Sequence, residues 1–128
     1  MNHLQSHIKK FLDDRGWINL QPANLAKSIS IEAAELLELF QWDNPTIEET
    51  LKDTPRMEDI QKELADIMIY CLQVSIFLKL DPEKIILDKL AHQSKKYPAQ
   101  LMKNGTKTQA GQDAYYQIKK DYREKAKE

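Results

Sequence analysis

Apolar residues recur every three or four positions along most of the chain, which is the period of an α-helix. The first apolar stripe consists of Leu4, Ile8, Phe11 and Leu12. Further helices are expected at about residues 25–42, 46–52, 56–80, 82–96 and 113–128, with a loop over 99–112. No segment shows the strict alternation of a β-strand. The pattern therefore predicts an all-α fold, a helical bundle of four or five substantial helices.

Capping residues and prolines indicate where these helices begin. Asn24 is the expected N-cap of the second helix, and Thr46 with Glu49 forms a capping box for the short third helix. The helix over 56–80 carries a stripe of core positions that includes Cys71, and it is apolar on nearly every side. A helix of that kind is typical of a central position or of an interface between subunits. We therefore expect a homo-oligomer.

Composition and charge narrow the function classes. The 128 residues fit one domain, and 19 Lys plus Arg against 20 Asp plus Glu give a net charge of −1. This balance argues against a nucleic-acid strand as partner. No apolar run approaches the roughly 20 residues of a membrane span, so no membrane partner is expected. A single cysteine and an N-terminus without a signal-peptide core predict a cytoplasmic protein.

Two pairs of carboxylates lie on the two longest predicted helices. Glu32 and Glu35 are three residues apart on one helix, and Glu63 and Asp66 are three apart on the other. The members of each pair lie about 60° apart on one helix face, next to apolar residues. If the two helices pack side by side, four carboxylates converge, and an all-oxygen site suits Mg²⁺ or Mn²⁺ rather than zinc. Such a site favours metal-assisted hydrolysis of a polyphosphate.

The same acids have a second interpretation, because glutamates at three-residue steps are common on solvated helix faces. The chain then fits a non-catalytic helical oligomerisation or interaction module. Scattered, exposed carboxylates favour the module, whereas convergence in one cleft favours the enzyme.

A di-iron bundle is a third interpretation of carboxylates on helices. It requires Glu-x-x-His, and none of His3, His7 and His92 stands three residues after a glutamate. That kind of site is excluded.

The acids belong to a longer pattern of residues. It comprises Arg15-Gly16-Trp17, Pro22-Ala23-Asn24-Leu25, the run from Glu32 to Trp42, Glu63-Leu64-Ala65-Asp66, Lys96-Tyr97-Pro98 and Gly105. Over about residues 8–105 the chain resembles the MazG-like all-α nucleoside triphosphate pyrophosphohydrolases, especially their small dCTP pyrophosphatase-like branch. The resemblance implies a MazG-like domain over 1–112, and residues 113–128 are expected to add a polar C-terminal helix or tail. It also favours a homo-oligomer, with the tetramer preferred and the dimer open.

The activity implied by this resemblance depends on Mg²⁺, with Mn²⁺ as a substitute. The enzyme would cleave a nucleoside triphosphate, dCTP-like or modified, into the monophosphate and pyrophosphate, and so clear unwanted nucleotides from the pool. The residues that match the family's metal ligands and carry catalysis are Glu32, Glu35, Glu63 and Asp66. Glu38 lies beside them on the shoulder of the same helix face and is expected to assist.

Aromatic and basic residues are the candidates for substrate binding. Trp17, Trp42 and Tyr70 match the positions that surround the base in the dCTP-hydrolysing relatives, where stacking would hold the ring. The alternative is that both tryptophans are core or interface residues. Lys95 and Lys96 are expected to meet phosphate oxygens as point charges. Two lysines at the end of a helix also complement its dipole, so this second role stays open.

Overall fold

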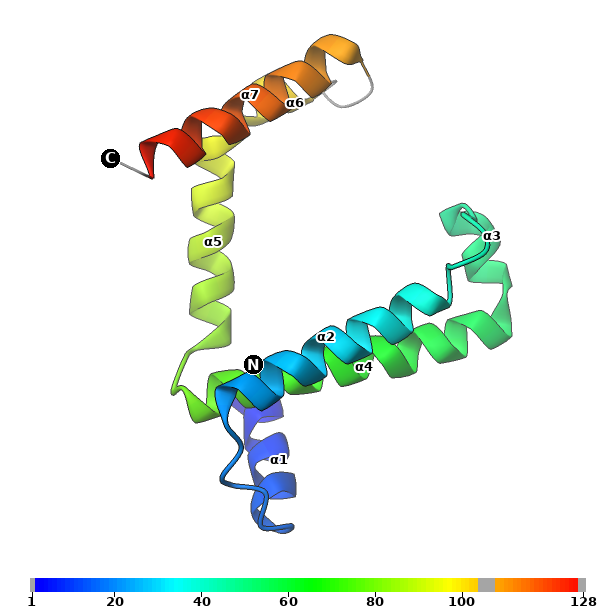
Figure 1. The fold of residues 1–128 in the computed structure, drawn as a ribbon, viewed down its shortest axis with the longest axis vertical. Coiled ribbons are helices and arrows are strands. Elements are labelled where there is room, and N and C mark those ends of the chain that lie inside the picture. The colour runs from blue at the N-terminus through cyan, green and yellow to red at the C-terminus, as the bar shows by residue number, and fades with distance from the viewer. Residues whose placement is uncertain (1, 104–107, 127–128) are drawn as a thin grey trace. The chain divides into compact units, whose positions relative to one another are not determined.

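The computed structural model describes residues 2–103 and 108–126 (Figure 1). The helices are α1 (Asn2–Asp13), α2 (Pro22–Glu38), α3 (Ile47–Lys52), α4 (Thr54–Phe77), α5 (Pro82–Lys96), α6 (Ala99–Met102) and α7 (Gln109–Lys125). The described part contains no strand, so the all-α prediction is confirmed. Gly105 lies outside the described residues. The chain divides into two compact units, residues 1–82 and 83–128, which are taken in turn.

The first unit is built on two long antiparallel helices. α2 and α4 lie side by side, and α3 reverses the chain between them (Figure 1). α1 packs on the C-terminal half of α4, where Gln5 Nε2 donates a hydrogen bond of 2.9 Å to Ser75 Oγ. Ser75 Oγ in turn donates to the Leu72 carbonyl oxygen at 2.7 Å. This buried polar link fixes the register of α1 against α4.

The fully buried apolar side chains of the described residues are few. They are Leu12 of α1, Leu25 of α2 and Leu72 of α4, with 2%, 1% and 8% of their surface exposed, together with Pro82 at the start of α5. Each of the three helices thus contributes one leucine to the centre of the first unit. Each of these leucine side chains loses nearly all of its contact with water, so each contributes to the hydrophobic stabilisation of the three-helix contact.

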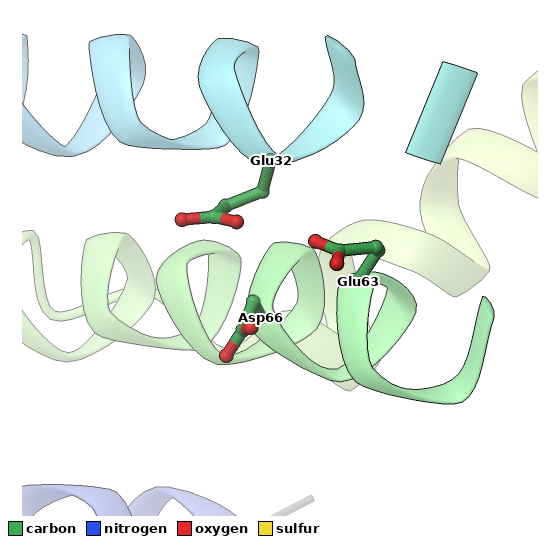
Figure 2. Close-up of side chains that lie close together, drawn as sticks. All are labelled: Glu32, Glu63 and Asp66. Atoms are coloured by element: carbon green, nitrogen blue, oxygen red, sulfur yellow. The ribbon is translucent and has the colours of Figure 1, made fainter. Parts of the chain in front are cut away.

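The core stripe predicted for α4 is covered only in part. Four of its residues are half-buried, namely Met57, Ile60, Ile67 and Val74. Leu64, Cys71 and Leu78 recur at steps of seven residues and are all exposed, and the prediction that Cys71 is a core residue is wrong. α2 faces the side of α4 that carries Glu63 and Asp66 (Figure 2). A helix that is apolar on nearly every side gives no hydrophobic contrast from which to choose between these faces.

The observed α2 differs from the predicted helix at both ends. It begins at Pro22 with Gln21 as N-cap, so the expected cap at Asn24 is wrong. Proline suits the first helical position because its missing N–H would have no partner there. The helix ends at Glu38 rather than at Trp42, because two of the following amides bond carbonyls three residues back, at 3.0 and 3.2 Å.

The other predicted boundaries have mixed outcomes. The capping box of α3 is confirmed: the Glu49 amide donates to Thr46 Oγ1 at 3.2 Å, and the Thr46 amide donates to the Glu49 carboxylate at 2.7 Å. The loop predicted over 99–112 is wrong in part, because α6 and the start of α7 lie within it. Thr108 caps α7 by accepting from the Gly111 amide, which moves the helix start ahead of residue 113.

In the second unit, aromatic residues of α5 and of the position just after it contact α7. The rings of Tyr97 and Tyr115 stack with their centroids 5.1 Å apart, and those of His92 and Tyr122 meet edge to face at 5.8 Å. The ammonium group of Lys96 lies 5.2 Å from the Tyr97 ring and 5.1 Å from the Tyr122 ring.

The domain division expected at residue 112 stays a prediction. None of the helices described is long and apolar enough to cross a membrane.

Candidate metal and nucleotide site

Acidic side chains from α2 and α4 meet at the interface of these helices. Figure 2 shows Glu32 of α2 pointing toward Glu63 and Asp66 of α4. One carboxylate oxygen from each residue lies within 4.8 Å of the others. Glu32 and Glu63 are half-buried and Asp66 is exposed. We call these three residues the acidic cluster.

Helix geometry explains the convergence. Glu63 and Asp66 are three residues apart, so they lie one turn apart on the same face of α4. Glu35 lies one turn after Glu32 on α2 and adjoins the cluster, since it interacts with both Glu32 and Glu63. Glu38, one turn further along, is exposed and is not part of the cluster. The structure thus brings together three of the four predicted metal ligands and places Glu35, which is exposed, next to them; the role of all four as ligands stays a prediction.

The electrostatics of the cluster are unfavourable without a cation. Partial burial raises the pKa of Glu32 above its ordinary value, and the charges of Glu35, Asp66 and Glu63 raise it further. The pKa of Glu63 is raised by partial burial and then by Glu35. Within the described residues, no lysine or arginine forms an ion pair with any of these four carboxylates. A bound cation would relieve this repulsion.

The donor set fits a hard divalent cation. All the donors are carboxylate oxygens, which Mg²⁺, Ca²⁺ and Mn²⁺ prefer, and no histidine or cysteine belongs to the cluster. Because Asp66 is exposed, one side of the cluster is open to solvent. A cation held here would keep positions for water and phosphate oxygens, as Mg²⁺ commonly does.

An aromatic cavity adjoins the acidic cluster. Asp66, Trp17 and Tyr70 line one cavity of about 390 Å³, and Trp17 and Tyr70 also line a second of about 250 Å³. Trp17 is half-exposed and meets the Phe11 ring edge to face, with centroids 5.9 Å apart. The larger volume is in the range of small-molecule sites. Two of the three aromatic residues predicted to bind the base are therefore neighbours beside Asp66.

The remaining predicted binding residues lie elsewhere. Trp42 follows the end of α2, is 90% exposed and lines neither of these cavities. Lys95 and Lys96 end α5 in the second unit, where the Lys96 ammonium rests against tyrosine rings. A contact between these three residues and the substrate stays a prediction.

Two features were missed in the sequence. Gln73 lines both aromatic cavities and is only 6% exposed. The sequence signal that could have found it is its spacing, because it stands seven residues after Asp66 and so lies on the same face of α4. Arg56 makes a two-point contact with the Asp43 carboxylate, at 3.1 and 2.8 Å, and lies 3.2 Å from Asp53. Arg56 thereby ties the turn after α2 to the start of α4, which no local sequence pattern indicates.

Comparison with known proteins assigns the family. The model of the MazG-like family matches residues 27–112, which include all four acidic residues of the site. The chain belongs to the MazG-like family. A MazG-like chain is expected to be all-α, as this one is, and the matched segment runs from α2 into α7.

Individual MazG-like relatives extend the comparison. The chain is 30% identical over 100 residues to dCTP pyrophosphatase 1 of Homo sapiens and 32% identical over 94 residues to that of Bos taurus. These matches cover 77% and 72% of this chain but 59% and 56% of the relatives, so the chain spans little more than half of their length. It also resembles the crystal structure of a pyrophosphatase from Archaeoglobus fulgidus, with a TM-score of 0.69 and 38% identity over 77% of this chain and 92% of that one.

Proposed function

We propose that this MazG-like protein is a nucleoside triphosphate pyrophosphohydrolase that depends on a divalent metal. It would convert a ribo- or deoxyribonucleoside triphosphate, dCTP-like or modified, to the monophosphate and pyrophosphate, as a housecleaning step. The observation that carries the proposal is the meeting of carboxylate oxygens from α2 and α4 within 4.8 Å, beside an aromatic cavity. The similarity of the chain to dCTP pyrophosphatase 1 and to the pyrophosphatase from Archaeoglobus fulgidus supports the proposal.

The chain's own residues divide the work between two regions. Glu32, Glu35, Glu63 and Asp66 would hold Mg²⁺, with Mn²⁺ as a substitute, on the side of the polyphosphate. Mg²⁺ bound there supplies charge neutralisation for the phosphates and a water of lowered pKa. Trp17 and Tyr70 would hold the base in the adjoining cavity, because any nucleobase can stack on an aromatic face.

Metal dependence gives the direct test of this function. The purified protein is incubated with Mg²⁺ and a panel of nucleoside triphosphates, and the release of pyrophosphate and of phosphate is measured separately. We expect pyrophosphate release from at least one substrate, its loss in excess chelator, and its recovery on addition of Mg²⁺ or Mn²⁺. Release of phosphate alone, or rates unchanged by chelator, would contradict the proposal.

The uncovered face of α4 supports association with further copies. Leu64, Met68 and Leu78 are 43%, 52% and 48% exposed, and Cys71 lies among them. We expect a homo-oligomer that buries these side chains, a tetramer in preference to a dimer, because several exposed apolar residues on one helix are typical of subunit interfaces. Light scattering should give a multiple of the mass of one chain, and Met68→Asp should lower it. A monomeric wild-type protein at micromolar concentration would refute this.

The cytoplasmic location expected from the sequence stays a prediction.

A further inference from the structure

The side chain of Gln73 is the polar group of the first unit whose burial lacks an explanation in the fold. It is only 6% exposed, and its amide oxygen has no hydrogen-bond partner among the described residues. A buried acceptor without a partner is destabilising, and an apolar side chain of similar length would fill the same space without that penalty. The position therefore favours an external donor that meets this oxygen.

The surroundings of Gln73 indicate where that donor comes from. Gln73 lines both cavities that Trp17 and Tyr70 share, and Asp66 lines the larger of the two. Asp66, Tyr70 and Gln73 stand at steps of four and three residues, so they form one row along α4. The row is about 10 Å long at 1.5 Å per residue. Along this row, the Tyr70 ring lies between Asp66 of the acidic cluster and the buried amide of Gln73.

This row suggests how a nucleotide would lie. If its phosphates bind at the acidic cluster and its ring stacks on Tyr70, its base edge lies toward Gln73. An oxygen acceptor at that position pairs with an N–H group of the base. The exocyclic amine of cytosine or adenine offers such a group, whereas the carbonyl at the same position of uracil or thymine opposes one acceptor to another.

We propose, resting on the function proposed above, that Gln73 selects the base of the substrate. Its amide oxygen accepts a hydrogen bond from an exocyclic amine in the Trp17–Tyr70 cavity. A site built around a hydrogen bond discriminates strongly against a ligand that lacks the donor, because the buried group then stays unpaired. The substrate class is accordingly a nucleotide with an amino-bearing base.

Binding of the two deoxyribonucleoside monophosphates dCMP and dUMP tests the proposal without requiring turnover, since their bases differ on one edge only: cytosine has an amine at C4 and an acceptor at N3, whereas uracil has a carbonyl at C4 and an N–H at N3. Calorimetry in the presence of Mg²⁺ should show that the wild-type protein binds dCMP at least tenfold more tightly than dUMP. Gln73→Met, which keeps length and removes the acceptor, should bring the two affinities within about twofold by weakening dCMP. Gln73→Glu, which keeps acceptor oxygens, should retain the preference.

The matched control is Gln61→Met, the same change at an exposed position of α4, which should keep the wild-type ratio. Equal affinities in the wild type, or an unchanged ratio in Gln73→Met, would overturn the proposal and indicate that water meets the amide. If Gln73→Met does not fold, Gln73→Glu decides: loss of the preference there refutes the proposal. Pyrophosphate release by the wild type is measured on the same preparations. A preference that depends on Gln73 without hydrolysis would refute only the enzymatic function, and hydrolysis with a ratio independent of Gln73 would refute only the base selection.

Discussion

Replacing Glu63 by Gln is expected to lower the rate of pyrophosphate release at least about 100-fold, since changes in the outer shell of a metal site alone cost 10–100-fold. Glu63 is half-buried, and one of its oxygens lies within 4.8 Å of oxygens from Glu32 and Asp66. The amide keeps the shape of the side chain but is a much weaker ligand for a hard cation. Initial rates at saturating Mg²⁺ and nucleotide measure the effect.

The same variant separates loss of the metal site from loss of the fold. Because burial and the Glu35 charge raise the pKa of Glu63 in the free protein, removing this charge relieves repulsion. The melting temperature without metal should therefore be at least that of the wild type. The rise in melting temperature on adding Mg²⁺ should be much smaller, because a ligand stabilises by mass action only where it binds.

Glu58→Gln is the matched control for Glu63→Gln. Glu58 is exposed on the same helix and lies outside the acidic cluster, so both the rate and the Mg²⁺-induced shift should stay at wild-type values. A Glu63→Gln protein with more than a tenth of the wild-type rate and an undiminished shift would refute the metal site.

Leu25→Ala is expected to lower the free energy of unfolding by about 2–5 kcal/mol, the range for a large side chain removed from a packed core. Leu25 is 1% exposed and lies beside Tyr70 and Gln73 at the contact of α2 with α4. Few buried side chains could move to fill the cavity left behind, because Leu12 and Leu72 are the only other buried leucines among the described residues. Urea unfolding at a fixed protein concentration gives the value.

Leu37→Ala tests whether burial is the cause. It is the same substitution in the same helix, but Leu37 is 67% exposed, so we expect a loss below about 1 kcal/mol. Equal losses in the two variants would contradict the assignment of Leu25 to the core.

The fold class and the acidic cluster were predictable because their signals are local. The helical period of apolar residues is read within one segment, and a spacing of three places Glu63 and Asp66 on one face whatever the rest of the chain does. The prediction that two such faces meet required only that α2 and α4 lie side by side, which the structure confirms.

The rest depended on packing between segments. The core stripe of α4 was predicted only in part. Leu64 and Cys71 are exposed although they are as hydrophobic as residues that are covered, whereas Glu63 and Gln73 lie toward α2. A glutamine on a helix looks like a surface residue, and only the neighbouring helix reveals that Gln73 is buried. If these residues form the proposed site, this is an expected place for hydrophobic patterning to fail, since functional sites conflict with local rules.

The position of the acidic cluster makes a bound cation part of the chain's connectivity. Glu32 and Glu63 lie on either side of α3 and both of its turns, so a cation held by both carboxylates would close this segment into a loop. Closing a loop removes conformations from the unfolded chain, as a disulfide does, but this cross-link would form and open with the concentration of the ion. Each binding event would then also reduce the conformational freedom of α3 and of the turn that carries Trp42.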